Sequence, residues 1–162
     1  MDELDTIDLQ ILRLLQADGR MSNTDLAQQV GLAPPTVLRR VKLLEEHGYI
    51  RGYAALVDPL ALGLTTTAFI FIETSAGCDL GELNEFLSQI PGVQEIHRLI
   101  GEWCFLLKVR TQTPQTLEQI VYQQLRSHPS VRRTFTTLAT SSTYESPALP
   151  LPDARALSGR KN

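Results

Sequence analysis

The chain has 162 residues, of which 43% are hydrophobic, and it carries 15 Lys and Arg against 18 Asp and Glu, a net charge of −3. This length predicts one or two domains with a substantial core. No apolar run approaches the roughly 18 residues that cross a membrane, and the acidic start MDELDTID differs from a signal peptide. Two cysteines, Cys78 and Cys104, indicate a reducing, cytoplasmic compartment. Secreted, membrane-spanning and collagen-like classes are therefore excluded.

The net charge hides a local pattern. Residues 1–33 carry two arginines against six acidic residues, a net charge of −4, whereas residues 34–57 carry three arginines and one lysine against two glutamates, a net charge of +2. A basic patch on an acidic chain can bind phosphate groups, because the acidic residues can face away from it. The acidic balance therefore does not exclude a nucleic-acid partner.

Three helices are predicted near the N-terminus. Apolar residues at helical spacing predict the first one. The second begins at Ser22, where Asp25 three residues later resembles a capping box, and ends at Gly31. The third extends from about Pro34 to His47, since proline suits a first helical turn.

The third helix is predicted to bury one apolar face and to expose a cationic one. A three-residue turn over 31–33 separates it from the second helix, and this arrangement is the sequence form of a helix-turn-helix. An α-helix fits the major groove of DNA, where arginine can pair with guanine. The residues predicted to contact DNA are Ser22, Asn23, Pro34, Pro35, Thr36, Arg39, Arg40, Arg51 and Tyr53.

Several of these assignments have an alternative that the sequence leaves open. Thr36 and Arg39 could lie on a solvated helix face, and Arg51 could belong to a strand that closes the helical core. Arg40 could bridge to an acidic residue of the first helix instead of contacting DNA. Ser22 could be an N-cap only. Tyr53 could be half-buried in a short strand, predicted for YIRGYAALV, that closes the helical core.

The second half of the chain has a different pattern. Pro59 and Gly63 break the periodicity and indicate a hinge at 58–64. From Thr65 the order βαββαβ is predicted, with strands TTTAFIFIE, VQEIHRLI, WCFLLKV and VRRTFTTLA and a tight hairpin at Gly101 and Glu102. A weak internal repeat supports this order, since Leu87, Pro91 and Val93 recur 38 residues later.

The predicted fold class is α+β: an N-terminal winged helix-turn-helix over 1–57, then a ferredoxin-like βαββαβ αβ-sandwich over 65–145. Residues 146–162, with three prolines and little periodicity, are predicted to be a flexible tail.

The strands predict self-association. FIFI, IHRLI and WCFLL are apolar on both faces, so the sheet face that no helix covers is expected to be buried against a second copy. A twofold homodimer would present two recognition helices to double-stranded DNA and would read a pseudo-palindromic operator.

Over about residues 4–145 the chain resembles the Lrp/AsnC (leucine-responsive, feast/famine) family of transcription regulators. The resemblance is carried by IDLQILRLLQADGRMSNTDLAQQVGLAPPTVLRRVKLLEEHGYIRGYAALVDPLALGL and by the hairpin GEWCFLLKV. It implies a DNA-binding regulator modulated by a small-molecule effector such as an amino acid. It also implies octamers, assembled as tetramers of dimers, and an effector site at Gly101, Glu102, Trp103 and Cys104.

Two residues depart from the family pattern. Ala33 replaces the serine that often caps the recognition helix; a lost cap usually costs about 1 kcal/mol, and two prolines without N–H groups reduce that cost. Cys104 stands where the family's hairpin usually has aspartate. A neutral thiol holds a ligand ammonium less well than a carboxylate does, so Glu102 is the candidate for that charge.

Enzyme chemistry finds little support in the sequence. The cysteines lack metal-ligand spacing, no cofactor is predicted, and there is no phosphate-binding loop or nucleophile elbow. Sirohaem decarboxylases share this architecture and use His and Arg in their second domain, so His97 and Arg98 keep such an enzyme as an alternative. An oligomerisation module without DNA affinity is a further alternative.

Overall fold

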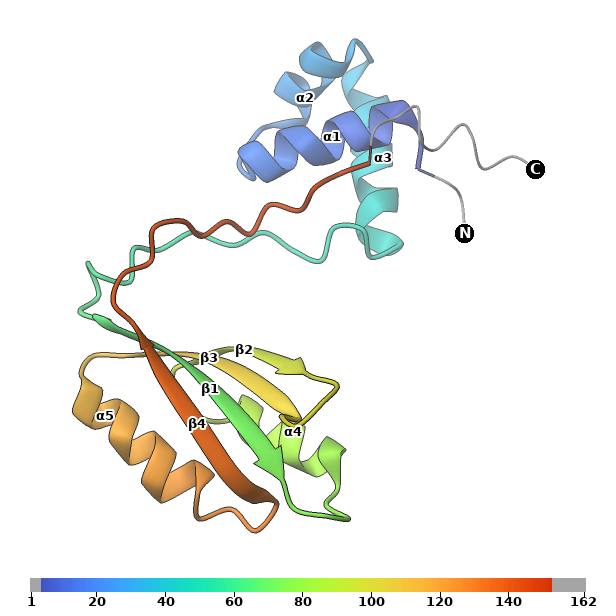
Figure 1. The fold of residues 1–162 in the computed structure, drawn as a ribbon. Coiled ribbons are helices and arrows are strands. Elements are labelled where there is room, and N and C mark those ends of the chain that lie inside the picture. The colour runs from blue at the N-terminus through green and yellow to red at the C-terminus, as the bar shows by residue number, and fades with distance from the viewer. Residues whose placement is uncertain (1–3, 153–162) are drawn as a thin grey trace. The chain divides into compact units, whose positions relative to one another are not determined.

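The computed structural model describes residues 4–152, and the chain divides into two compact units. The helical unit contains the described residues up to Leu56 and also residues 145–152, whereas the sheet unit contains residues 57–144. The first unit contains three helices, and the second contains a sheet with its helices (Figure 1). The helical unit is therefore discontinuous in sequence. Within the described range no helix is long and apolar enough to span a bilayer.

The helical unit has helices α1 (Thr6–Ala17), α2 (Asn23–Val30) and α3 (Pro34–Glu46). Asp5 caps α1 in a reciprocal capping box with Asp8, which satisfies two free N–H groups of the first turn. Gly31, at φ 70°, ends α2 in the left-handed conformation that glycine adopts readily. The predicted third helix is confirmed with proline at its first turn and no side-chain cap at Ala33.

Apolar faces of the three helices form the core of this unit. Its fully or nearly fully buried members recur at helical spacing, and they are Ile11, Leu12, Leu26, Ala27, Val30, Val37, Val41 and Leu44. No strand occurs over residues 49–57, where one was predicted for YIRGYAALV. Gly52, at φ 152°, interrupts the extended run, and no ladder partner for it occurs in the described chain.

The sheet unit has strands β1 (Thr66–Thr74), β2 (Val93–Arg98), β3 (Phe105–Thr111) and β4 (Val131–Ala139). All pairs are antiparallel, and the order β2-β3-β1-β4 places β1 and β3 at the centre. This is the predicted ferredoxin-like βαββαβ arrangement. The connection between β2 and β3 occupies residues 99–104, so the hairpin is wider than the sequence predicted.

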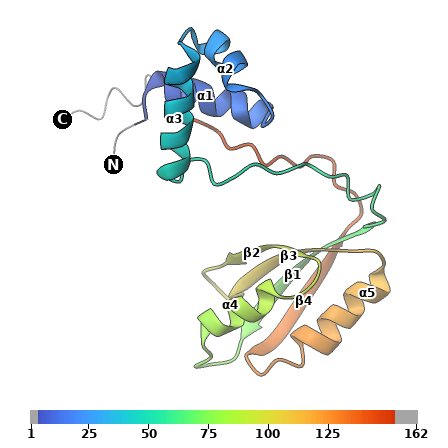
Figure 2. The same ribbon diagram turned by 180° about the vertical axis from the view of Figure 1, so that it is seen from behind.

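Helices cover one face of the sheet, as Figure 2 shows: α4 (Leu80–Ser88), and α5 (Pro114–Gln119) continued by the π-helix η1 (Ile120–Leu125). Ala68, Ile70 and Ile72 of β1 point towards them and are fully buried. Their neighbours in sequence point to the opposite face because side chains alternate along a strand. That open face carries Phe69, Phe71 and Phe135 and has no covering element in the unit.

The C-terminal segment differs from the prediction of a flexible tail. Residues 149–152 form hydrogen bonds with α1, and Leu151 packs against the helical core. Leucines between prolines give this segment both apolar side chains and a restricted backbone. The remainder of the predicted tail, residues 153–162, lies outside the described residues.

Candidate DNA interface and effector hairpin

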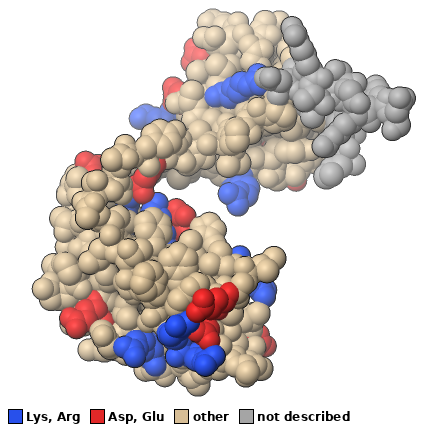
Figure 3. Space-filling model, in the orientation of Figure 1, with Lys and Arg blue, Asp and Glu red and all other residues tan. Residues whose placement is uncertain are grey.

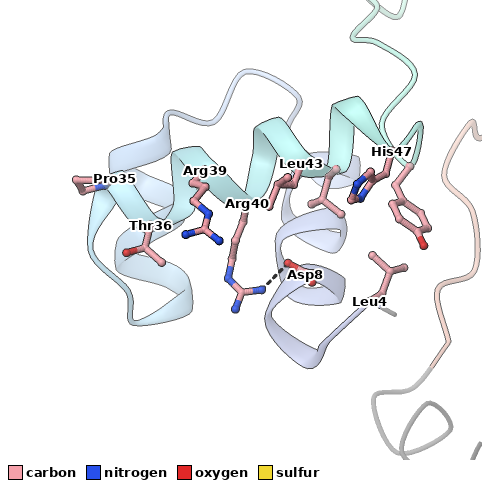
Figure 4. Close-up of a pocket in the computed structure, with 10 residues that line it drawn as sticks. Leu4, Asp8, Pro35, Thr36, Arg39, Arg40, Leu43 and His47 are labelled. Carbon is pink, nitrogen blue, oxygen red and sulfur yellow. Dashed lines mark hydrogen bonds and ion pairs between the residues drawn. The ribbon is translucent and has the colours of Figure 1, made fainter. Parts of the chain in front are cut away.

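The outer face of α3 carries the residues predicted to contact DNA. Thr36 and Arg39 are exposed, and Figure 4 shows their side chains projecting from the same side of the helix. Arg39 makes no hydrogen bond or ion pair with another residue of the described chain, and the same holds for Lys42 one turn later. Two cations on one helix face, unpaired within the described chain, are available for phosphates or base edges.

Arg40 points elsewhere. Its Nη1 lies 2.7 Å from Asp5 Oδ2 and 2.7 Å from Asp8 Oδ1, so it joins α3 to the start of α1 (Figure 4 shows the bond to Asp8). The hydrogen bond that the Arg40 guanidinium donates to the Asp8 carboxylate, followed by the one it donates to Asp5, raises the pKa of Arg40. Partial burial raises the pKa of Asp5, but bonds from the Asp8 amide and from Arg40 outweigh it and leave that pKa below its ordinary value. The bridging alternative left open by the sequence is thus the arrangement observed.

Two residues on this face were missed in the sequence analysis. Leu38 is 41% exposed beside Arg39, and Lys42 follows one turn later. A shallow groove runs along these positions, lined by Pro35, Leu38, Arg39, Lys42, Leu43 and Glu46. Leu38 lies three residues after Pro35 and Lys42 four residues after Leu38, and this helical spacing could have identified both residues. An exposed leucine here offers an apolar contact for a thymine methyl group.

A larger hollow of about 470 Å³ lies between α3 and the start of α1 (Figure 4). Its lining is Leu4, Asp8, Pro35, Thr36, Arg39, Arg40, Leu43, Leu44, His47 and Tyr49. It brings together four of the predicted DNA-contacting residues, so the candidate interface is concave rather than a bare helix ridge.

The other predicted contacts lie on other elements. Ser22 caps α2, since its hydroxyl accepts a hydrogen bond from the Asp25 amide and donates one of 2.6 Å to the Asp25 carboxylate. Asn23 is the first residue of α2 and Pro34 the first of α3, and helix N-termini favour anions. Arg51 is exposed.

Tyr53 contacts α3 from the segment that follows it. Its hydroxyl donates a 3.0 Å hydrogen bond to Glu45 Oε1. Partial burial, with a smaller effect from Glu45, raises the pKa of the Tyr53 phenol. The observed contact is therefore with the protein itself, and more than half of the side chain remains exposed.

The hairpin 99–104 is joined by an ion pair to the start of β4. Arg133 donates to Glu102, and its Nε lies 2.9 Å from Glu73 Oε2, while Arg132 Nη1 lies 2.6 Å from Glu73 Oε1. The hydrogen bond with Glu102, followed by that with Glu73, raises the pKa of Arg133. Figure 3 shows basic and acidic side chains gathered together on one part of the sheet unit. Of these charged residues only Glu102 was predicted as a site residue, because the strand register that brings the others beside it is a tertiary feature.

Aromatic rings surround these charges. The Arg133 guanidinium lies 4.6 Å from the centroid of the Trp103 ring, which is cation–π distance. Trp103 lies 6.0 Å from Phe71 and 6.2 Å from Phe135, and those two rings are 6.0 Å apart. We call Phe71, Trp103 and Phe135 the aromatic triad. It lies at the edge of the open sheet face, next to the hairpin predicted to bind an effector.

Gly101 and Cys104 complete the predicted effector hairpin. Gly101 has φ 138°, a conformation that L side chains rarely adopt, so glycine is required for the loop. Cys104 is half-buried and accepts a 3.2 Å hydrogen bond from Thr74 Oγ1. Cys104 also packs against the core of the sheet unit.

His97 and Arg98, the pair that left an enzyme open, lie on edge strand β2. His97 Nε2 and Lys108 Nζ each lie 3.1 Å from the Glu95 carboxylate. Hydrogen bonds from His97 and Lys108 lower the pKa of Glu95. Within the described range no group of three His, Cys, Asp or Glu could hold a metal ion.

Comparison with known proteins identifies both units. Residues 4–51 match a family model described as winged helix-turn-helix DNA-binding, and residues 67–149 match the Lrp/AsnC ligand binding domain. The proline dehydrogenase transcriptional activator of Rhizobium radiobacter is 36% identical over 89% of this chain and 94% of its own length. The leucine-responsive regulatory protein of Escherichia coli is 35% identical over 83% of each chain.

Solved structures give the same result. A transcriptional regulator of Neisseria meningitidis in complex with L-Met matches with a TM-score of 0.86 and 32% identity over 91% of this chain and 96% of that one. An AsnC family regulator of Agrobacterium tumefaciens matches with a TM-score of 0.82, 29% identity and coverage of 91% and 97%. These relatives are regulators rather than enzymes. The chain belongs to the Lrp/AsnC family of DNA-binding transcriptional regulators.

Proposed function

We propose that the outer face of α3 reads the operator. The observation that carries this proposal is the cationic face of Arg39 and Lys42, unpaired within the described chain, on the last helix of the matched helix-turn-helix. Arg39 is assigned to a base edge and Thr36 to a base or a phosphate. Arg40 has a different role: bound to Asp5 and Asp8, it positions α3 against α1.

Phosphate contacts are assigned to residues on both sides of the outer face of α3. The first turn of α2, with Ser22 and Asn23, presents N–H groups to an anion. The first turn of α3, with Pro34 and Pro35, presents only the positive end of its helix dipole, because proline has no N–H group. Arg51 adds a cation beyond α3. Such contacts fix the register of the protein on DNA without reading sequence.

The ligand of the sheet unit is assigned as a small α-amino acid at the hairpin 99–104. A relative was solved with L-Met, and the residues around this hairpin supply the chemistry for such a ligand. Glu102 offers a carboxylate to an ammonium, Arg133 offers a guanidinium to a carboxylate, and Trp103 offers an apolar wall. Because Glu102 and Arg133 bond to each other, a bound zwitterion would exchange one ion pair for two.

The assembly is assigned as a homodimer through the open sheet face. This face carries the aromatic triad, of which Phe135 is 54% exposed in the single chain, and exposed aromatic patches mark interfaces. Dimers would present two α3 helices to a pseudo-palindromic site in the cytoplasm. Association of dimers into octamers, biased by ligand at the hairpin, would change promoter geometry.

Selection of fragments of the source genome bound by the purified protein, with and without each amino acid, tests the whole proposal. Enrichment of a pseudo-palindromic motif whose occupancy changes with one amino acid is the expected result. Fragments no richer in any motif than the input would contradict sequence-specific reading. An enriched motif indifferent to every amino acid would contradict only the ligand assignment.

A further inference from the structure

Side chains on the outer side of α1 form hydrogen bonds with the backbone of the C-terminal segment. The Gln16 amide pairs twice with Leu149: its Nε2 donates to the carbonyl at 3.1 Å, and its Oε1 accepts from the N–H at 2.6 Å. Arg13 Nη2 donates to the carbonyl of Pro152 at 3.0 Å. Gln16 thus binds Leu149 as a neighbouring strand would, and the segment is fixed at both ends.

Apolar burial accompanies these bonds. Leu151 packs against the core of the helical unit. Leu9 lies four residues before Arg13 and seven before Gln16, hence on the same face of α1, and it is 0% exposed. A leucine on the outer face of a terminal helix is buried only if another segment covers it. The C-terminal segment held by Arg13 and Gln16 is positioned to do so.

The sequence of this segment suits an extended docked peptide. Prolines at 147, 150 and 152 restrict the backbone to φ near −65° and so reduce the entropy lost on docking. They also lack N–H groups, so few donors need partners. Among the remaining amides, that of Leu149 is bound by Gln16. The few backbone groups that the segment offers are therefore suited to the hydrogen-bonding side chains on the outer side of α1.

The same helix is bonded to the recognition helix. Asp5 and Asp8 at the start of α1 hold Arg40 of α3, while Arg13 and Gln16 further along α1 hold the C-terminal segment. That segment follows β4, the strand whose Arg133 bonds to the hairpin at Glu102. A continuous chain of contacts and covalent bonds therefore runs from hairpin to α3 without using the connector that follows α3.

We propose that residues 149–152 form a strap that completes the DNA-binding unit and gives the sheet unit a second connection, through α1, to the recognition helix. The consequence for ligand response rests on the proposed function. The strap itself does not, because its docking surface and its occupant are both in the helical unit. Release of the strap makes α1 more mobile. Through the bonds of Arg40 to Asp5 and Asp8, it also weakens the packing of α3 against α1.

Hydrogen exchange followed by mass spectrometry tests the docking in the full chain. Gln16→Ala removes both bonds to Leu149, so exchange of the 145–152 peptide should accelerate about fivefold or more, with α1 following. Gln28→Ala is the matched control, because Gln28 is also an exposed helical glutamine of this unit and makes no bond to the strap. Equal exchange in both variants would overturn the docking.

DNA affinity tests the connection. A duplex selected from random-sequence DNA by the wild-type protein is the probe, read by fluorescence anisotropy. Gln16→Ala and a chain ending at Tyr144 should bind it at least about fivefold more weakly, while Gln28→Ala binds as wild type does. If the wild type selects no DNA, the proposed function fails. If it does and Gln16→Ala binds equally well, the strap does not connect to α3.

Discussion

The two units arrange their charges in opposite ways. On α3, Arg39 and Lys42 project without a partner in the described chain, whereas at the hairpin Arg133 is already bound by Glu102, Glu73 and the Trp103 ring. A surface that binds a polyanion such as DNA gains from cations that have no ion pair within the protein to break first. A site for a small zwitterion gains from charges that are preorganised and exchange one partner for another. Whether a cation is already paired within the protein therefore indicates its role better than its presence in the sequence does.

The largest expected effect concerns the open sheet face. Phe135→Glu places a charge within the aromatic triad and should weaken dimerisation by at least about 2 kcal/mol, or about thirtyfold. Sedimentation or light scattering over a concentration series measures it. Tyr122→Glu is the matched control, because Tyr122 on η1 is 58% exposed, close to the 54% of Phe135, but lies on the helical side. Equal dimerisation of both variants would contradict the assignment.

Arg39→Ala should cost about 1–3 kcal/mol of specific DNA binding and leave thermal stability unchanged, because its side chain has no partner in the described chain to lose. Titration of the selected duplex and of a scrambled duplex separates base reading from phosphate binding. Arg126→Ala, an exposed arginine of the sheet unit, is the control. Equal losses on both duplexes would reassign Arg39 to the backbone.

Arg40→Ala should do the reverse. It leaves the carboxylates of Asp5 and Asp8 facing each other, so the helical unit should lose about 1–2 kcal/mol of stability after solvent screening is allowed for. Thermal unfolding followed by circular dichroism measures the loss. A variant as stable as the wild type but deficient in DNA binding would show that Arg40 reads DNA directly.

The pH dependence should be the smallest effect. The pKa of Asp5 is lowered in the folded protein, so its contribution to stability is present above the ordinary value of 3.8 and is lost as the pH falls through the lower folded value. The melting temperature should therefore decline below about pH 4. Asp5→Asn should show a shallower decline over the same window. Parallel curves for both proteins would show that Asp5 does not contribute to the pH dependence.

Local sequence determined much of the helical unit and of the sheet. The caps at Ser22 and Gly31, the proline start of α3 and the bounds of β4 follow from residues within one turn or one strand, where propensity and periodicity act. The residues on the outer face of α3 could be predicted from the sequence for the same reason. Leu38 was missed because an apolar residue on a helix predicts burial unless its neighbours are known.

Which residues contact each other over long sequence separations depended on tertiary packing. The partners of Arg40 are 35 and 32 residues away, those of Arg133 are 60 and 31 residues away, and Gln16 meets Leu149 at a separation of 133. Such contacts depend on sheet register and helix packing, which no local pattern encodes. The strand predicted after α3 does not form, because extended residues make a strand only when a neighbouring strand pairs with them. Sequence thus chose the elements and their exposed chemistry, whereas packing assigned each charge either to the protein or to its ligands.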